Sequence, residues 1–235
     1  MRLQRYIALN SSYSRRKAEV LIEEGRVSVN GEIVTKLGTQ VDPETNPKVT
    51  VDDETIKPKA ETITLMLNKP SGYITTRSDT ENRKTVMDLI PYDDLFPVGR
   101  LDRDTEGLLL LTNDGDLAYK ITHPKFEHEK EYMVYSKKEL TQAQKEALEK
   151  GVMIDKKMTS PCEVDIKDRK TKNNHGVCHV TIHEGRKRQI KRMFEEIGNP
   201  VIYLMRVRIG KLRLGSLEKG KFRILNNNEI DKLLA

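Results

Sequence analysis

The sequence predicts an α+β protein in two parts: a small N-terminal α/β domain and a larger domain on a mixed, mainly antiparallel sheet with flanking helices. Strand-type and helix-type patterns alternate along the 235 residues. The apolar run at 108–111 is typical of a strand buried on both faces. A stretch rich in Pro, Asp, Glu and Thr at 42–62 predicts a linker near 56–62, which gives domains at 1–58 and 59–235.

The small domain is predicted from a short helix, a second helix and a hairpin. Residues 13–25 (YSRRKAEVLIEEG) favour the second helix, because Ser14 can cap its first turn and Gly25 stands where helices commonly end. Alternating valines then flank Asn30 and Gly31, a dipeptide typical of a two-residue hairpin turn of type I′. These elements predict one compact unit.

The larger domain is predicted from strands and helices that follow one another along the chain. Its central strand is the apolar run at 108–111, between Gly107 and the turn at 113–115. The other elements are a strand–turn–strand at 63–76, a strand at 131–135, a helix at 141–151, a strand at 176–185, a helix at 186–198, strands and turns at 211–225, and a final helix at 226–235.

The composition excludes several classes of protein. No apolar run approaches the roughly 18 residues that cross a bilayer, and the N-terminus has no secretory pattern. The two cysteines, Cys162 and Cys178, form no CxxC pair. We therefore expect a reduced, cytoplasmic protein without a membrane association.

The positive charge of the chain is concentrated in two segments. The formal net charge is +6, but residues 183–213 alone carry nine Lys or Arg against three Glu. Residues 1–36 carry seven against four, so the remainder is mildly acidic. Two separate basic segments indicate a polyanion bound at two places. For either segment alone, a solvated helix face is the preferred explanation.

The helix at 186–198 predicts a cation that faces inward. Ile190, Met193, Phe194 and Ile197 recur at helical spacing and mark the buried face, and Arg186 lies four residues before Ile190 on that same face. An inward arginine is costly unless it is paired with a carboxylate.

A candidate partner for Arg186 is Asp102, which stands just before the buried run at 108–111. An aspartate held against arginine stays ionised, which suits a nucleophile or base. A structural salt bridge without a catalytic role explains the spacing equally well. The neighbouring acids Asp104, Glu106, Asp114 and Asp116 lie in contexts typical of turns and caps.

Several motifs resemble one enzyme family in the order in which they occur. GRLDRDTEGLLLLTNDG at 99–115 is similar to the signature of the RsuA/RluB-type pseudouridine synthases that act on ribosomal RNA. Further similar motifs are LNKPSGYI at 67–74, KEYMV at 130–134, EGRKRQIKRMF at 184–194 and RVRIGKLRLGSLEKGKFR at 206–223. SRRKAEVLIEEGRVSVNG at 14–31 resembles the S4-type RNA-binding domain that precedes the catalytic domain in this family.

The resemblance implies roles for individual residues. Asp102 would be the catalytic carboxylate, and Arg186 would pair with it. Tyr132 would stack on the target uracil, and Ile190 would pack beside the base. The residues expected to contact RNA phosphates are Arg15, Arg16, Lys17, Arg100, Lys187, Arg188, Lys191 and Arg192, and the last four of these would face outward. The family reaction is an isomerisation, so no cofactor and no metal are expected.

The resemblance also implies the substrate and the partners. A uridine in ribosomal RNA would be isomerised to pseudouridine, with 23S favoured over 16S RNA. The target base must leave its stack to reach Asp102. We expect a monomer that binds ribosomal RNA and needs no obligate protein partner. Whether Asp102 attacks C1′ or removes a proton from C2′ is open.

Three other interpretations compete with this one. The acids around Asp102 would suit a magnesium-dependent nuclease, although Arg186 would compete with the metal. An RNA-binding ribosome assembly factor without catalysis would share the fold. Cys162, His175, Cys178 and His179 are residue types that bind zinc, but alternation along the strand places Cys178 and His179 on opposite faces.

Overall fold

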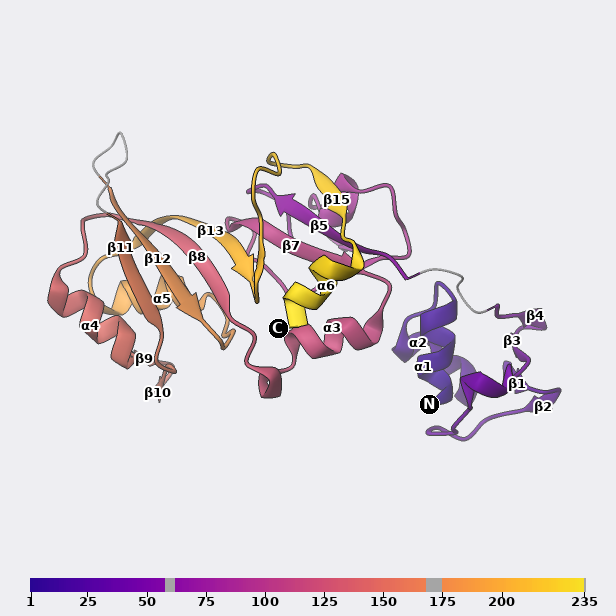
Figure 1. Cartoon of the computed structure of the whole chain (residues 1–235). Coiled ribbons are helices and arrows are strands. Elements are labelled where there is room, and N and C mark those ends of the chain that lie inside the picture. The colour runs from indigo at the N-terminus through magenta and orange to yellow at the C-terminus, as the bar shows by residue number, and fades with distance from the viewer. Residues whose placement is uncertain (58–61, 168–174, 235) are drawn as a thin grey trace. The chain divides into compact units, whose positions relative to one another are not determined.

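The computed structural model describes residues 1–57, 62–167 and 175–234, and the chain divides into two compact units. One unit contains residues 1–62 with 113–115, and the other contains residues 63–112 with 116–235 (Figure 1). The predicted boundary between residues 58 and 59 lies outside the described residues. No helix in the described ranges is long and apolar enough to cross a membrane.

The first unit packs two helices against a four-stranded sheet. Its elements are α1 (Leu3–Asn10), α2 (Arg15–Glu23), β1 (Val27–Val29), β2 (Glu32–Ile33), η1 (Pro43–Thr45), β3 (Val49–Val51) and β4 (Glu54–Thr55), with strand order β2-β1-β3-β4. The Ser14 hydroxyl accepts a hydrogen bond from the amide of Lys17 at 3.1 Å, which confirms the predicted cap of α2. Asn30 and Gly31 both have positive φ, at 52° and 90°, which confirms the type I′ turn.

The core of the first unit extends further along the chain than the sequence predicts. Leu3, Ile7, Leu21 and Ile22 are fully buried between the helices and the sheet. Ile56 packs into the same cluster. The expected linker at 56–62 therefore begins too early, because its first residue belongs to the core.

The second unit is built on a nine-stranded mixed sheet. Its main strands are β5 (Thr64–Lys69), β6 (Phe96–Val98), β7 (Glu106–Thr112), β8 (Lys130–Ser136), β11 (Glu163–Lys167), β12 (Gly176–Ile182), β13 (Val201–Ile209), β14 (Leu212–Arg213) and β15 (Phe222–Ile224). The order is β11-β12-β8-β13-β7-β5-β15, with β14 beside β13 and β6 beside β7. Within the described ranges only the β13–β7 pair of these strands is parallel, which confirms a mixed, mainly antiparallel sheet.

Helices cover the two faces of this sheet in different places. The remaining elements are η2 (Val86–Leu89), α3 (Gly115–Thr122), η3 (Pro124–Phe126), α4 (Gln142–Lys150), the hairpin β9 (Met153–Ile154) and β10 (Lys157–Met158), α5 (Gln189–Glu196) and α6 (Asn227–Leu234). One hydrophobic cluster joins α4 and α5 to strands β8, β11, β12 and β13 (Figure 1). Another joins α3 and α6 to β5 and β7.

Strand β7 is buried on both faces, as the sequence predicts. All seven of its residues are buried. Leu108 and Leu110 pack into the cluster with α3 and α6, whereas Leu109 and Leu111 pack with η2. The strand that follows the Asp102 segment is therefore buried at the centre of the second unit.

The sequence did not predict α3, β3, β4, β6 or β9–β11, and three further differences bear on the site. Strand β13 is the longest strand in the described ranges and was not predicted, and Arg206 is buried within it although arginine is rarely buried. The strand expected after the turn at 70–72 is absent, and Ile74 makes only one isolated bridge, to Thr85. Helix α5 begins at Gln189 instead of Arg186, because Arg188 is left-handed at φ 53°.

Gly107 is a position where the fold requires glycine. Its φ is +97°, and a Cβ there would lie 2.2 Å from the carbonyl oxygen of Arg206 on β13. We expect Gly107→Ala to lower the free energy of unfolding by about 3 kcal/mol, through backbone strain and overpacking. Chemical denaturation measures this change.

Gly72→Ala is the matched control for this prediction. Gly72 has a similar φ of +93°, but a Cβ there meets no atom within 4 Å. It should therefore show only the strain, about 1 kcal/mol. Equal losses in the two variants would contradict a steric role for the contact between β7 and β13.

Candidate active site

A row of paired residues crosses the centre of the sheet in the second unit. Tyr132 on β8 pairs with Arg206 on β13, Arg206 pairs with Gly107 on β7, and Gly107 pairs with Lys69 on β5. Neighbouring strands are about 4.8 Å apart, so Tyr132 and Gly107 are separated by roughly 10 Å across the sheet. The loop that carries Asp102 therefore enters β7 close to Tyr132.

The loop between β6 and β7 is anchored on either side of Asp102. Leu101 is buried, and its amide and carbonyl both hydrogen-bond the Thr75 hydroxyl, at 3.2 and 2.8 Å. The amide of Thr105 donates to the carbonyl of Asp102 at 3.1 Å and closes a tight turn. Asp102 itself is half-buried. The backbone of the candidate catalytic residue is thus held in one conformation.

Lys69 anchors the same loop from the interior of the protein. Its side chain is completely buried, and its ammonium donates to the carbonyls of Pro70 (3.1 Å), Asp102 (3.1 Å), Arg103 (3.2 Å) and Thr105 (2.9 Å). Burial lowers the pKa of Lys69 to about 8. No sequence pattern predicted a role for Lys69, although its place at the end of a buried strand was a usable signal.

Tyr132 contacts both of the hydrophobic clusters that border the candidate site. It is half-buried and packs against the hydrophobic cluster that contains Ile190 of α5. It also packs against the cluster that contains Leu101, the neighbour of Asp102. The structure therefore brings three of the residues predicted for catalysis into one region: Asp102, Tyr132 and Ile190.

Lys191 joins α5 to the Asp102 loop. Its ammonium lies 2.5 Å from the Asp104 carboxylate, and its side chain is only 9% exposed. Burial opposes ionisation of Asp104, but the hydrogen bond and charge of Lys191 outweigh it and lower the pKa of that carboxyl. The prediction that Lys191 faces outward is wrong, because this position flanks the buried face of α5 and its long side chain reaches the loop.

Arg186 does not reach Asp102. It lies in the turn before α5, where its guanidinium pairs with Glu184 at 3.2 Å and donates to the carbonyls of Lys157 and Met158 on β10. Asp102 and Arg186 are both in the described ranges, and no ion pair joins them there. The predicted pair is therefore wrong, because the helix starts after Arg186 and the i, i+4 argument does not apply.

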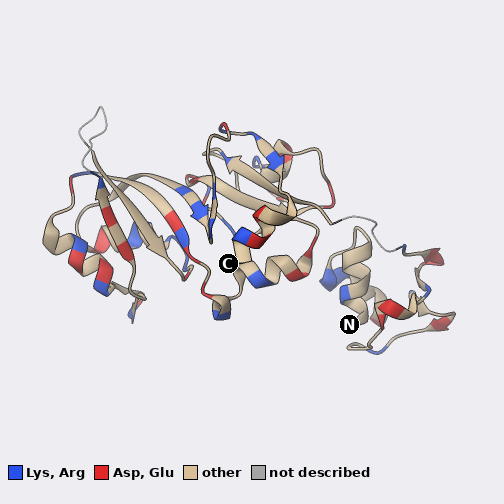
Figure 2. Cartoon of the chain, viewed as in Figure 1, with Lys and Arg blue, Asp and Glu red and all other residues tan. Residues whose placement is uncertain are grey.

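The other predicted RNA contacts are mostly exposed. Arg100, Lys187 and Arg188 are exposed in the second unit. Arg192 instead forms a two-pronged ion pair with Asp155 beside the β9–β10 hairpin. In the first unit the start of α2 carries the exposed residues Arg15, Arg16 and Lys17, whereas β2 and β4 carry acids (Figure 2).

Two further cations, the half-buried Lys130 and the buried Arg206, lie on the face of the sheet that carries Tyr132. The Lys130 ammonium donates to the carbonyls of His128 (2.8 Å) and His183 (3.4 Å), and burial lowers its pKa to about 8. Arg206 is only 4% exposed, and its guanidinium donates to the carbonyl of Leu108 at 2.8 Å. Like Lys69, these cations are bound by backbone carbonyls, so they contribute positive charge to this region.

The donor set does not suit a metal. In the described part of the chain, no group of three or more His, Cys, Asp or Glu side chains is placed to hold an ion. Cys178 is buried in the core and His179 pairs with Glu131 at 2.6 Å, on the opposite faces that strand alternation predicts. The sequence predicted Glu106 in a turn or cap. It is instead buried at the start of β7, where Lys219 and Tyr203 bind it.

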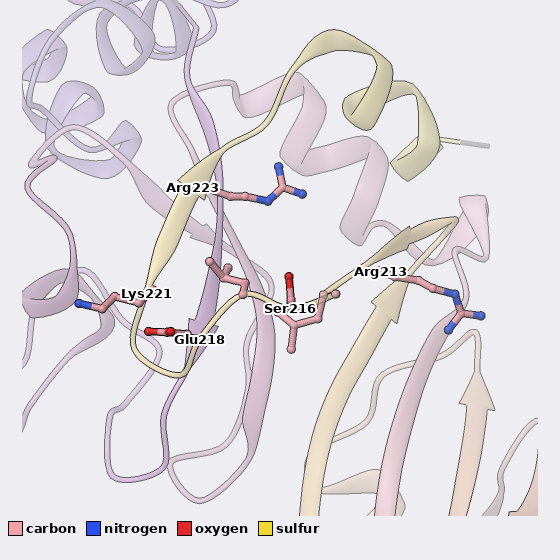
Figure 3. Close-up of a pocket in the computed structure, with 8 residues that line it drawn as sticks. Arg213, Ser216, Glu218, Lys221 and Arg223 are labelled. Atoms are coloured by element: carbon pink, nitrogen blue, oxygen red, sulfur yellow. The ribbon is translucent and has the colours of Figure 1, made fainter.

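A pocket of about 480 Å³ lies away from these residues, along the segment from β14 to β15. Arg213, Ser216, Lys221 and Arg223 are among its lining residues, but Arg213 and Lys221 point to opposite sides (Figure 3). Arg223 is bound to Glu229, at 2.5 and 2.8 Å. These polar groups do not converge, and the pocket contains none of the predicted site residues.

Comparison with known proteins identifies the family of the chain. The RNA pseudouridylate synthase family model matches residues 63–196, and the S4 domain model matches residues 1–46. A Bacillus subtilis protein named ribosomal large subunit pseudouridine synthase B is 41% identical over all of this chain and 96% of its own length. An Aquifex aeolicus protein named as an uncharacterized RNA pseudouridine synthase is 39% identical over 99% of this chain and 93% of its own.

A solved structure extends the similarity to the fold. A crystal structure of a pseudouridylate synthase matches with a TM-score of 0.71 at 36% identity and covers 99% of both chains. The matched segment of the catalytic family model contains Asp102, Tyr132 and Lys191. With an S4 domain at its N-terminus and this centre on its sheet, the chain belongs to the RNA pseudouridylate synthase family and is a pseudouridine synthase.

Proposed function

We propose that this enzyme isomerises one uridine of ribosomal RNA, in 23S rather than 16S RNA, with Asp102 as the catalytic carboxylate. The observation that carries this proposal is the Asp102 loop itself, which Lys69 and Lys191 hold beside Tyr132. The name of the Bacillus subtilis relative supports the choice of the large subunit. The enzyme would act in the cytoplasm as a monomer, without an obligate protein partner.

The proposed reaction needs no redox partner, since its atoms balance within the substrate. The bond between N1 and C1′ breaks, the uracil rotates, and C5 forms a new bond to C1′. The proton on C5 is then lost, and N1 carries a proton. Asp102 would begin this sequence either by attack on C1′ or by removal of a proton from C2′.

Tyr132 and Ile190 would hold the uracil while it is detached. The base must leave its stack to reach Asp102. The ring of Tyr132 offers an aromatic face on which such a base can lie, and Ile190 packs into the same cluster. A base held by stacking and apolar contact keeps the freedom to rotate in its plane, which the reaction requires.

Lys191 would take the part that the sequence analysis gave to Arg186. It is the cation that α5 brings to the Asp102 loop, through Asp104. Arg186 holds the β9–β10 hairpin to the turn before α5 instead. We therefore propose Lys191 as a positioning residue for the catalytic loop.

Two exposed basic surfaces would bind the phosphates of the RNA. Arg15, Arg16 and Lys17 lie in the S4-type domain, which we place at residues 1–58. Arg100, Lys187 and Arg188 lie in the catalytic domain, which we place at residues 59–235. Two domains on one chain bind one RNA more tightly than either does alone, because the second contact is intramolecular.

The first test concerns Asp102. Asp102→Asn keeps the size of the side chain but removes its charge, so pseudouridine formation should fall below detection while RNA binding remains. Pseudouridine mapping of ribosomal RNA from cells with the gene, without it, and with the variant measures this. Asp93→Asn, at an exposed aspartate of the same domain, should behave as wild type.

Two results would contradict the proposed function. If no position in ribosomal RNA loses pseudouridine without the gene, the proposed substrate is wrong. If the Asp102→Asn protein restores the modification, then Asp102 is not the catalytic residue. Loss of ribosome assembly alone, with every pseudouridine intact, would favour an assembly factor without catalysis.

The second test concerns the contact between α5 and the loop. Lys191→Met removes the ion pair with Asp104, so kcat should fall by about 100-fold through misplacement of Asp102. Single-turnover assays on an RNA transcript measure this loss. Lys187→Met, at an exposed neighbour, should raise KM and leave kcat nearly unchanged. Equal effects on kcat would contradict a positioning role.

The third test concerns the phosphate contacts. Six exposed cations would bind phosphates, so RNA affinity should fall about 1,000-fold between roughly 50 and 200 mM salt. Replacement of Arg15, Arg16 and Lys17 by Gln should lower the slope of log K against log salt by about 2 to 3. Fluorescence anisotropy with labelled RNA measures both. A slope that the triple variant leaves unchanged would exclude α2 from the interface.

A further inference from the structure

A group of aromatic side chains gathers on the surface between α3 and β8. The ring centroids of Tyr119 and His123 are 4.7 Å apart, and those of Tyr119 and Phe126 are 6.1 Å apart with the rings nearly perpendicular. His128 stacks on Phe126 at 6.1 Å. Aromatic residues make up only 5% of this chain and none is a tryptophan. We call these four rings the aromatic surface.

The two largest rings of this surface do not pack into the hydrophobic core. Tyr119 is 47% exposed and Phe126 is 40% exposed. The side of α3 that packs into the protein consists of Leu117 and Ile121 instead. Neighbouring exposed aromatic rings commonly mark a binding site, because a domain gains little stability from rings it leaves in water.

Positive charge accompanies the aromatic rings. The Lys125 ammonium lies 4.6 Å from the centre of the Phe126 ring and 5.5 Å from that of Tyr119. Lys120 is exposed on α3, whereas Glu127 is the exposed acid of the η3 turn. Rings that stack on bases, together with cations that meet phosphates, are the features by which proteins bind single-stranded RNA.

The aromatic surface adjoins chain segments that lead to the candidate active site. A Cβ at Gly99, which opens the Asp102 loop, would lie 3.6 Å from Thr122 Cγ2, between Tyr119 and His123 in the chain. At the other end of the aromatic surface, the carbonyl of His128 accepts a hydrogen bond from the ammonium of Lys130, which lies two residues before Tyr132. The surface therefore borders both segments that carry the catalytic residues.

We propose that the aromatic surface binds an unpaired base of the RNA substrate that is not the target uridine. The base stacks on Phe126 and Tyr119, and Lys125 meets its phosphate. This inference rests on the proposed function, because it assigns a second contact on the same RNA. Such a contact fixes the strand beside the everted uridine and selects substrates with an unpaired neighbour.

A tryptophan reporter tests the stacking directly. Since the chain has no tryptophan, Phe126→Trp introduces the only tryptophan of the protein, which can be excited separately from its tyrosines. A transcript of 23S RNA with unpaired loops should quench it, and a blunt RNA duplex should not. Ile202→Trp, at a side chain that is 52% exposed on β13, is the control and should respond to neither.

Truncation of the rings tests the effect on activity. Phe126→Ala and Tyr119→Ala should each weaken binding of the transcript at least about fivefold, with the loss in KM rather than in kcat. Tyr119→Phe retains the ring and should restore the affinity. Ile202→Ala removes a similarly exposed apolar side chain and should have no effect.

The outcomes separate this inference from the proposed function. If the wild type forms pseudouridine but the ring variants keep its affinity and the reporter stays unquenched, the aromatic surface does not bind RNA. If a ribosomal protein changes the reporter while RNA does not, the surface serves a protein partner and the inference is wrong. If the wild type forms no pseudouridine but the ring variants still lose affinity, RNA binding here stands and the proposed catalysis fails.

Discussion

The candidate site depends on the buried ammonium of Lys69. Removing a charge from water is costly, and the structure offsets this cost with four backbone carbonyls, three of them from the loop around Asp102. Between the buried Leu101 and Thr105, the loop carries charged side chains that are half-buried or exposed, so packing there cannot hold it. The Lys69 ammonium binds the backbone of Asp102, Arg103 and Thr105 from the interior and leaves the carboxylate of Asp102 free to meet a substrate.

A second contact then decides how the basic motif meets this loop. Lys191 reaches Asp104 from the first turn of α5, whereas Arg186 is occupied by Glu184 and the carbonyls of β10. Helical periodicity predicts the opposite arrangement only if the helix begins at Arg186. The left-handed backbone of Arg188 ends that periodicity, and a sequence pattern alone does not reveal it. The predicted pair was Arg186 with Asp102. The pair that the structure contains at this loop is Lys191 with Asp104.

The elements that were predicted correctly depend on residues that are close together in the sequence. The Asn30-Gly31 turn and the cap at Ser14 follow from backbone preferences, and the run at 108–111 follows from its hydrophobicity. Elements that depend on distant partners were missed. Strand β13 contains a buried arginine, which only its neighbours β7 and β8 can accommodate, and the segment after the turn at 70–72 bonds to the Asp102 loop instead of a strand. Lys69 was missed because lysine is rarely buried, so its residue type predicts exposure.

The division between cations that backbone carbonyls hold in place and exposed cations has a consequence for how the enzyme would bind RNA. Lys69, Lys130 and Arg206 are held by carbonyls and cannot follow a moving phosphate, so their field acts at one fixed place on the sheet. The exposed cations at the start of α2 and before α5 are hydrated and adaptable, which suits phosphates whose positions vary with RNA sequence. Affinity for RNA and precision at the reacting carbon can thus change independently. A protein built in this way can acquire new RNA targets by altering its surface, because Lys69, the fixed cation that binds the Asp102 loop, lies beneath it.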